Sequence, residues 1–361
     1  MKLFGPNNHS KYRVQWETLP KSKQKEVAAL ISSHYGFDDV KQSSVAKVQE
    51  WARMSNNFRV RVKSEGKWSN ILFRKHIQLK DKKSFDVLDK LFGFLLTEGV
   101  PVPRIVRTKD GKTTFQEGDS FYVMYEFIPG NHYRGTLKEL KDIARQTALL
   151  HLALQETPFA REIAAKRQIV VPWTMEGWDA IFEAAKLKRG KMVDLVKESR
   201  DFILQEAQKI QKGFKNVRPT KMQPIHCDLH PQNTIFSKKE RLIAFLDFEG
   251  VRMGEVCRDA ANACHRFVRQ FAVCQGGEWR KTVPQGLKIF MKEYTKVSPL
   301  KEVRLFPLYI QDEILRKLFQ DLSRYCLENN QRQVEGGELE KKLNLLKEAS
   351  ILEEYYGKLR R

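Results

Sequence analysis

The stretch His226-Cys227-Asp228-Leu229-His230-Pro231-Gln232-Asn233 decides how this chain is interpreted. Fourteen residues after Asn233 comes a second polar segment, Asp247-Phe248-Glu249-Gly250. It follows the apolar run 242–246, which predicts that Asp247 lies at the end of a short buried strand. Two carboxylates and one side-chain amide are therefore expected near one another, within a hairpin-like segment covering 224–250.

The spacing H-x-D-L-x-x-x-N is typical of phosphotransferase catalytic loops, and a following D-F pair is typical of their metal-binding strand end. Phosphoryl transfer needs a carboxylate to align the attacking hydroxyl, and hard oxygen ligands to hold Mg²⁺ on the triphosphate. We therefore expect Asp228 to be the catalytic residue, and Asn233 and Asp247 to bind Mg²⁺. The set predicts a nucleotide-dependent kinase, and the sequence does not distinguish ATP from GTP.

The composition is that of a folded protein with a basic surface. The 361 residues carry a net charge of +21 and are 41% hydrophobic, enough for one large domain or two lobes. Such a charge favours an anionic partner, such as a nucleotide or a phosphorylated sugar, or simply a solvated lysine-rich surface. The basic residues are spread along the chain, and no recognition motif accompanies them, which argues against a nucleic-acid partner.

The cysteines and the apolar stretches predict where the protein works. Five cysteines without a CxxC pair argue against a disulfide framework and a zinc site, and fit a reducing compartment. The first residues lack the apolar core of a secretory signal, and the longest apolar runs are far short of the roughly 20 residues that span a bilayer. We expect a cytoplasmic protein without a membrane span.

The residue pattern changes from strand-rich to helical along the chain. Strands are predicted over 45–62 (two strands around a turn at 54–57), 67–76, 104–108 and 120–127, with helices at 25–35 and 82–97. Helices are predicted over 137–154, twice or more within 178–214, from 258 onward, and over 339–359, where an apolar stripe indicates a packing helix. We expect an α+β fold with a small antiparallel N-terminal lobe, residues 1–130, and a mostly helical C-terminal lobe, residues 131–361.

The order of these segments resembles the aminoglycoside phosphotransferase and choline kinase family, the small-molecule branch of the protein-kinase-like fold. The resemblance runs from about Val45 to Arg266 and rests on the stretches 122–130, 226–233 and 246–248. It implies a two-lobed kinase-like fold, Mg-ATP as phosphate donor and a small-molecule acceptor. It also implies that His226 and His230 brace the catalytic loop, and that Asp259 caps the next helix and hydrogen-bonds the loop.

The resemblance also assigns a phosphate-binding cation to the third strand of the sheet. Alternation along Ile71-Leu72-Phe73-Arg74-Lys75 places Arg74 and Lys75 on opposite faces. Arg74 is favoured, with Lys75 as the alternative. Its acidic partner is expected on the following helix, at Asp86 or Asp89.

Two further segments are candidates for binding the nucleotide. The turn 53–58 lacks the G-x-G-x-x-G of protein kinases, but the backbone N–H groups of Ser55 and Asn56 can still cradle phosphate. The segment Met124 to Phe127, including Glu126, resembles the inter-lobe linker that meets the adenine edge.

The acceptor itself has no sequence signature. The basic composition favours a neutral or anionic acceptor over a polycationic antibiotic, and Glu249 and Arg252 are placed to face it. Two alternatives keep the fold: a catalytically inactive, spore-coat-like structural protein, and a protein kinase. Only residues 248–258 separate Asp247 from Asp259, too few for a long protein-binding loop.

Overall fold

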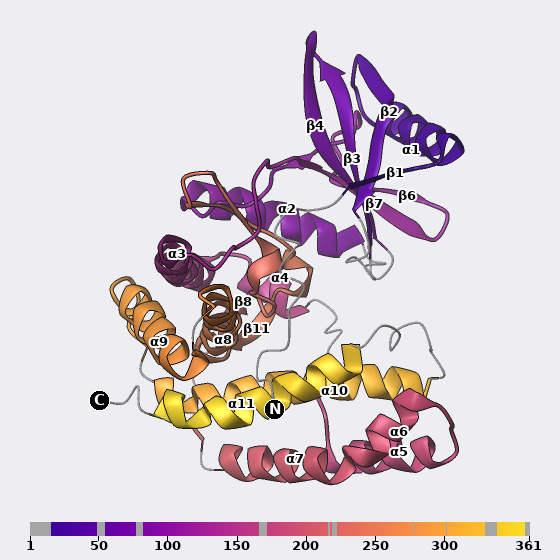
Figure 1. Cartoon of the computed structure of the whole chain (residues 1–361). Helices are drawn as coiled ribbons and strands as arrows, with labels where there is room; N and C mark the ends of the chain where they lie inside the picture. The colour runs from indigo at the N-terminus through magenta and orange to yellow at the C-terminus, as the bar shows by residue number, and fades with distance from the viewer. Residues whose placement is uncertain are drawn as a thin grey trace.

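The computed structural model describes residues 16–48, 55–76, 82–165, 172–215, 217–218, 222–276, 278–300, 302–328 and 338–357. A twisted sheet with two helices lies at one end, and a larger, mostly helical lobe lies at the other (Figure 1). This arrangement confirms the α+β, two-lobed, kinase-like fold expected from the sequence.

The N-terminal sheet is antiparallel and has seven strands in the described part of the chain. Its order is β1-β2-β3-β4-β7-β5, with β6 paired to β7. The strands are β1 (Trp16–Thr18), β2 (Asp39–Val48), β3 (Ser55–Ser64), β4 (Lys67–His76), β5 (Ile105–Val106), β6 (Phe115–Glu117) and β7 (Ser120–Glu126). The sequence did not predict β1 and β6, because three residues are too few to show a strand period.

The turn predicted at 54–57 lies partly within a strand instead. Ser55 already pairs with His76, and Asn57 pairs with Arg74, as the first residues of β3. The connection from β2 to β3, residues 49–54, lies outside the described residues.

The two faces of the sheet are covered by different helices. Helix α1 (Lys21–His34) packs with the apolar side chains of one face, among them Phe73 and Met124. Helix α2 (Lys82–Thr97) belongs to a second core that continues into the helical lobe and includes Leu72 as a partly buried member. Arg74 follows Leu72 by two residues, so alternation turns its side chain toward the helical lobe.

The helical lobe surrounds that second core. Its helices are α3 (Leu137–Glu156), α4 (Ala160–Ala165), α5 (Met175–Lys186), α6 (Lys191–Glu198), α7 (Arg200–Phe214), α8 (Val256–Cys274), α9 (Trp279–Thr295), α10 (Phe306–Cys326) and α11 (Glu338–Gly357). The apolar stripe of α11 is buried from Leu339 to Tyr356, which confirms the predicted packing helix. Among the described residues, no helix has both the length and the apolar character needed to cross a membrane.

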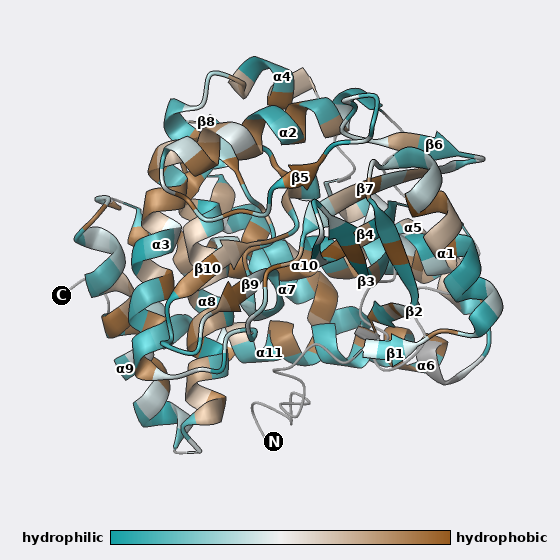
Figure 2. Cartoon of the chain, turned by 90° about the horizontal axis from the view of Figure 1, so that it is seen from above, coloured by the Kyte–Doolittle hydropathy of each residue, from teal (hydrophilic) through white to brown (hydrophobic). Residues whose placement is uncertain are grey.

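The segment that carries the motif residues forms two short strand pairs between these helices, as expected. Strand β8 (Met222–Ile225) pairs with β11 (Arg252–Glu255), and β9 (Thr234–Phe236) pairs with β10 (Leu242–Phe245), both antiparallel. Figure 2 shows β9 and β10 in apolar colours near the centre of the molecule, and most of their residues are buried. The core thus holds the strands from which the motif loops emerge.

The chain passes between the lobes through a short linker that is fixed at both ends. The Glu126 N–H donates to the Arg104 carbonyl (2.9 Å), while Asn131 exchanges two backbone hydrogen bonds with Phe236 (3.0 and 2.7 Å). A Cβ at Gly130 would lie 2.4 Å from Ile235 Cγ2 and 2.6 Å from the Phe236 carbonyl oxygen. Glycine is therefore required for this close approach. The predicted division of the domains after Gly130 stays a prediction.

Replacing Gly130 tests this contact. Gly130→Ala should lower the free energy of unfolding by about 1–3 kcal/mol, because the added methyl group overlaps backbone as well as a side chain. Urea unfolding measures the change. Gly93→Ala is the matched control, because this α2 glycine has open space around its Cβ position and should lose no stability. Equal stability of the two variants would contradict the close approach.

Candidate active site

His226 ties the catalytic loop to the end of β10. The side chain is buried, with Nε2 2.8 Å from the Leu246 carbonyl oxygen, while Nδ1 accepts from the Asp228 N–H (3.3 Å). These contacts fit the neutral ring with its proton on Nε2. The ring therefore links the residue before Asp247 to the backbone of Asp228.

A buried carboxylate holds the start of the same loop. Asp259 accepts from the backbone N–H groups of His226 (2.9 Å) and Cys227 (3.0 Å), and lies 3.2 Å from His151 Nε2. Burial raises the pKa of Asp259. The hydrogen bond and charge of His151 lower that pKa by more than burial raises it, so the net pKa lies below its usual range. The expectation that Asp259 caps α8 is wrong. The N-cap residue is Glu255, and Asp259 lies one turn inside the helix with its oxygens occupied by the loop.

Cys227 has a left-handed backbone, with φ of 72°. Such a φ favours glycine, which has no Cβ. Its thiol is buried, and burial raises the pKa of Cys227, so the thiol stays protonated at neutral pH. The backbone at Cys227 is thus held in a conformation that is unfavourable for a residue with a side chain.

Asp228 is held by two basic side chains. Its Oδ1 lies 2.7 Å from Lys317 Nζ, and its Oδ2 lies 3.4 Å from His230 Nε2. Burial alone would raise the pKa of Asp228, but Lys317 and His230 hold it well below its usual range. The carboxylate is therefore ionised at neutral pH.

Lys317 was not predicted from the sequence. It lies on α10, 89 residues from Asp228, and also contacts Glu313 Oε1 at 3.5 Å. No local motif marks it, because its helix has an ordinary amphipathic pattern. Only the packing of α10 against the catalytic lobe brings it to the site.

Asn233 and Asp247 lie on the other side of the loop. The Asn233 Nδ2 donates to the Asp228 carbonyl (2.9 Å), which leaves its Oδ1 available as a ligand. Asp247 has a left-handed backbone (φ 65°), and its carboxylate is 38% exposed. Burial raises the pKa of Asp247, and Arg74 lowers it. The negative charges of Glu249 and Asp228 raise it again, so the net pKa of Asp247 lies above its usual range. An amide oxygen beside crowded carboxylates is a donor set that fits Mg²⁺.

Arg74 is the cation of β4 that faces this site. Its guanidinium lies 2.9 Å from Glu249 Oε1 and 3.2 Å from Asp247 Oδ1. Burial lowers the pKa of Arg74, but these two carboxylates raise it more. Lys75 has its Nζ over the Tyr122 ring at 5.7 Å. The two β4 cations thus have different surroundings, and Arg74 is the one beside the motif residues.

The acidic partner of Arg74 comes from the helical lobe instead of α2. Asp86 accepts from Thr113 Oγ1 (2.9 Å), and Asp89 pairs with Arg107. Both aspartates have near partners in the segment before β6, whereas Glu249 reaches Arg74. Glu249 therefore faces β4, not the acceptor side where the sequence analysis placed it.

The residues expected to bind the nucleotide base and phosphates are spread along β3 and β7. Asn56 lies in β3 opposite Lys75, and Ser55 begins that strand; residues 53 and 54 lie outside the described residues. The Met124 side chain is fully buried in the core beside α1, and its backbone pairs with strands on both sides. Glu126 is exposed, and Phe127 is the first residue after β7. The described linker backbone that follows the sheet therefore starts at Phe127.

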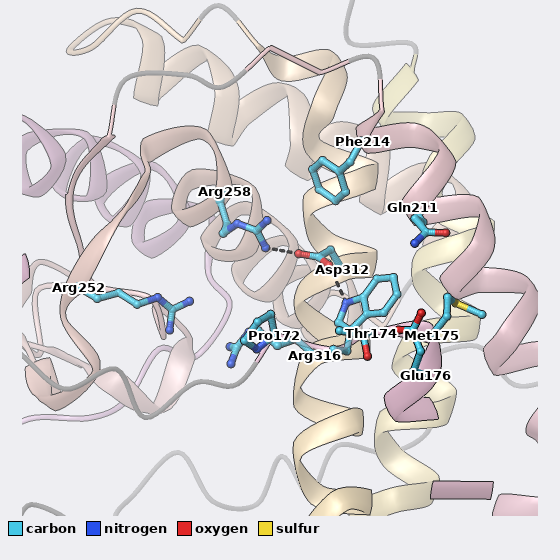
Figure 3. Close-up of a pocket in the computed structure, with 11 residues that line it drawn as sticks. Pro172, Thr174, Met175, Glu176, Gln211, Phe214, Arg252, Arg258, Asp312 and Arg316 are labelled. Atoms are coloured by element: carbon cyan, nitrogen blue, oxygen red, sulfur yellow. Dashed lines mark hydrogen bonds and ion pairs between the residues drawn. The ribbon is translucent and has the colours of Figure 1, made fainter. Parts of the chain in front are cut away.

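A cavity of about 530 Å³ lies beside α10. Its walls come from the start of α5, the end of α7, β11, the start of α8 and α10 (Figure 3). Arg316 lines it, and the next residue, Lys317, contacts Asp228. The cavity therefore shares helix α10 with Lys317, the partner of Asp228.

Comparisons with known proteins place this site in a family. The model of the phosphotransferase enzyme family matches residues 53–300, whereas no curated protein matches the sequence. A spectinomycin phosphotransferase solved with ADP and spectinomycin is 16% identical, with a TM-score of 0.65 over 92% of this chain and 98% of that chain. An amicoumacin kinase solved with AMP-PNP and Ca²⁺ is 14% identical (TM-score 0.61, 92% and 94% covered). The Plasmodium vivax ethanolamine kinase is 15% identical (TM-score 0.57, 94% and 96% covered).

At these identities the solved structures show a shared fold. The family model spans most of the chain and includes Arg74, the catalytic loop and Asp247. It therefore confirms the family that the motif residues indicated: the protein belongs to the phosphotransferase enzyme family.

Proposed function

We propose that the protein transfers the γ-phosphate of Mg-ATP to a hydroxyl group of a small molecule. The observation that carries this proposal is the ionised Asp228, held on a fixed loop beside Asn233 and Asp247. A carboxylate in this state can align a hydroxyl group and accept its proton. The membership of the phosphotransferase family supports the same chemistry.

The remaining residues divide into ligands and supports. Asn233 Oδ1 and the Asp247 carboxylate would hold Mg²⁺, which supplies charge neutralisation at the phosphates. Arg74 would contact the phosphates from β4, positioned by Glu249 and Asp247. His226, His230 and Asp259 would keep the loop in place.

The nucleotide would lie against the linker and β3. Since the Glu126 N–H already donates to Arg104, the backbone from Phe127 onward is better placed to meet the adenine edge than Met124. Asn56, with the backbone of Ser55, would lie on the phosphate side. Bound ADP and AMP-PNP in two proteins of this fold support nucleotide use.

A small acceptor fits better than a protein acceptor. The residues between Asp247 and Asp259 form a short 3-10 helix, then β11, which pairs with β8, and then the start of α8. This segment is part of the lobe structure and offers little chain for a protein-binding loop. The intact motif residues likewise favour an enzyme over an inactive structural protein.

Removing the Asp228 carboxylate tests the catalytic assignment. Asp228→Asn should lower kcat by about 10²- to 10⁴-fold, because the amide cannot accept the proton. ADP release with an acceptor found by screening sugars, amino-alcohols and hydroxy acids measures the loss. Melting temperature and Mg-ADP binding serve as controls and should stay close to wild type. A near-wild-type rate would contradict the assignment.

Lys317 offers a test of the charge at Asp228. Because Lys317 lowers the pKa of Asp228, Lys317→Met should raise that pKa, and the acid limb of kcat/KM should move to higher pH. In the wild-type protein, Asp228 should stay ionised at pH values below the ordinary aspartate pKa of about 3.9. Lys281→Met, an exposed substitution on α9, is the control and should leave the profile in place. Superimposable profiles for all three proteins would rule out this influence.

Asp247 tests the metal site. At about 100 times its Kd, a nucleotide stabilises the native state by roughly 2.7 kcal/mol, which raises the melting temperature measurably. Thermal shifts with ATP, GTP and ADP should depend on Mg²⁺ in wild type, and Asp247→Asn should lose that dependence. A Mg²⁺-dependent shift that survives the substitution would place the metal elsewhere.

A further inference from the structure

The cavity beside α10 is surrounded by arginine side chains. Arg252 comes from β11, Arg258 from α8 and Arg316 from α10, and all three line it (Figure 3). Figure 3 shows Arg252 extending from its strand into the space between β11 and α10. Like charges that converge around one cavity repel each other unless an anion compensates them.

Two of these arginines already have carboxylate partners. Arg258 pairs with Asp312, which also accepts from Trp173 Nε1 (2.8 Å). Arg316 donates to Glu313 Oε2 through Nε (2.9 Å). Burial raises the pKa of Glu313, but Lys317 and Arg316 lower it more, so this carboxylate is ionised. Both arginine pairs are therefore close to neutral.

Arg252 is different. Within the residues that the structure describes, no ion pair joins its guanidinium to a carboxylate. Glu176 also lines the cavity, but it is exposed at the start of α5, on the opposite side of the space in Figure 3. Arg252 thus brings to the cavity a guanidinium without an ion-pair partner among the described residues, with five donors suited to a carboxylate or a phosphate.

This charge lies near the reacting group. Arg252 pairs across the strands with Ile225, three residues before Asp228. On the other wall, Arg316 lines the cavity and Lys317 contacts Asp228. The cavity is therefore bordered by the strand pair that leads into the loop carrying Asp228 and by the helix that carries its partner Lys317.

The same walls are poorly suited to a cationic acceptor. The carboxylates of Asp312 and Glu313 are taken by arginines. The Arg258 guanidinium also lies over the rings of Tyr309 (4.9 Å) and Phe214 (5.8 Å), so these two faces are occupied. Near Arg258 and Arg316, an ammonium group would therefore meet carboxylates and rings that arginines already engage, and the other lining acid, Glu176, is exposed at the start of α5.

We infer that the acceptor is a hydroxyl compound with a carboxylate or phosphate group, and that Arg252 binds that group. This inference rests on the proposed function, because it names the substrate class of the same site. The hydroxyl group would lie at Asp228, and the anionic group would receive charge-assisted hydrogen bonds from Arg252.

Binding to the Mg-ADP complex tests the inference without turnover. Calorimetric titrations would use glycerol, D-glycerate, glycerol 3-phosphate and ethanolamine, which differ in charge around a hydroxyl group. Wild type should bind the glycerate or the phosphate ester more tightly than glycerol or ethanolamine, and the preferred one identifies the anionic group. Arg252→Ala should weaken that binding by roughly ten- to a hundredfold. Arg252→Lys should recover part of it, more for phosphate than for a bidentate carboxylate.

Arg280→Ala is the matched control, because this exposed arginine of α9 does not line the cavity and stacks on Trp279. It should bind all four probes like wild type. Binding of neither anionic probe, tighter binding of ethanolamine, or an Arg252→Ala variant with unchanged affinity would each overturn the inference. Failure of wild type to bind Mg-ADP would instead overturn the proposed function, so the two failures are distinguishable.

Discussion

The geometry of the site depends on one buried carboxylate. Asp259, which is 1% exposed, accepts hydrogen bonds from two backbone N–H groups at the start of the catalytic loop and contacts His151. Hydrogen bonds to a buried, ionised carboxylate are among the stronger ones in proteins. Without Asp259, the N–H groups of His226 and Cys227 would lose this acceptor. These hydrogen bonds also keep Cys227 in its left-handed conformation, which directs the next residue, Asp228, toward α10. The position of Asp228 thus depends on a carboxylate 31 residues further along the chain.

Much of this could be predicted from the sequence where the signal is local. The spacing of Asp228, Asn233 and Asp247, the paired strands around them, and the buried stripe of α11 all depend on short-range periodicity or motif spacing. Strand alternation put Arg74 and Lys75 on opposite faces, the family resemblance favoured Arg74, and the structure places Arg74 beside Asp247. In these cases the pattern and the physical cause lie within the same few residues.

What the sequence could not predict depends on contacts between distant segments. Glu249 takes the position beside Arg74 that was expected for Asp86 or Asp89, because α2 turns its aspartates toward Thr113 and Arg107. Lys317 reaches Asp228 only through the packing of α10. The residues around the cavity belong to five different elements. The family model ends at residue 300, before α10 begins at Phe306, so the matched region contains Asp228, Asn233 and Asp247 but not the α10 wall of the cavity.

The linker also determines how the lobes can move relative to each other. In the described part of the chain, the segment after β7 crosses between them, held to the sheet at Glu126 and to β9 at Asn131. A hinge between the lobes must therefore be absorbed by the backbone dihedrals of residues 127–130. Proline fixes one of these angles at Pro129, and the crowding around Gly130 restricts others. Within this linker, the backbone is therefore least restricted at Phe127 and Ile128, where rotation of one lobe against the other would be easiest.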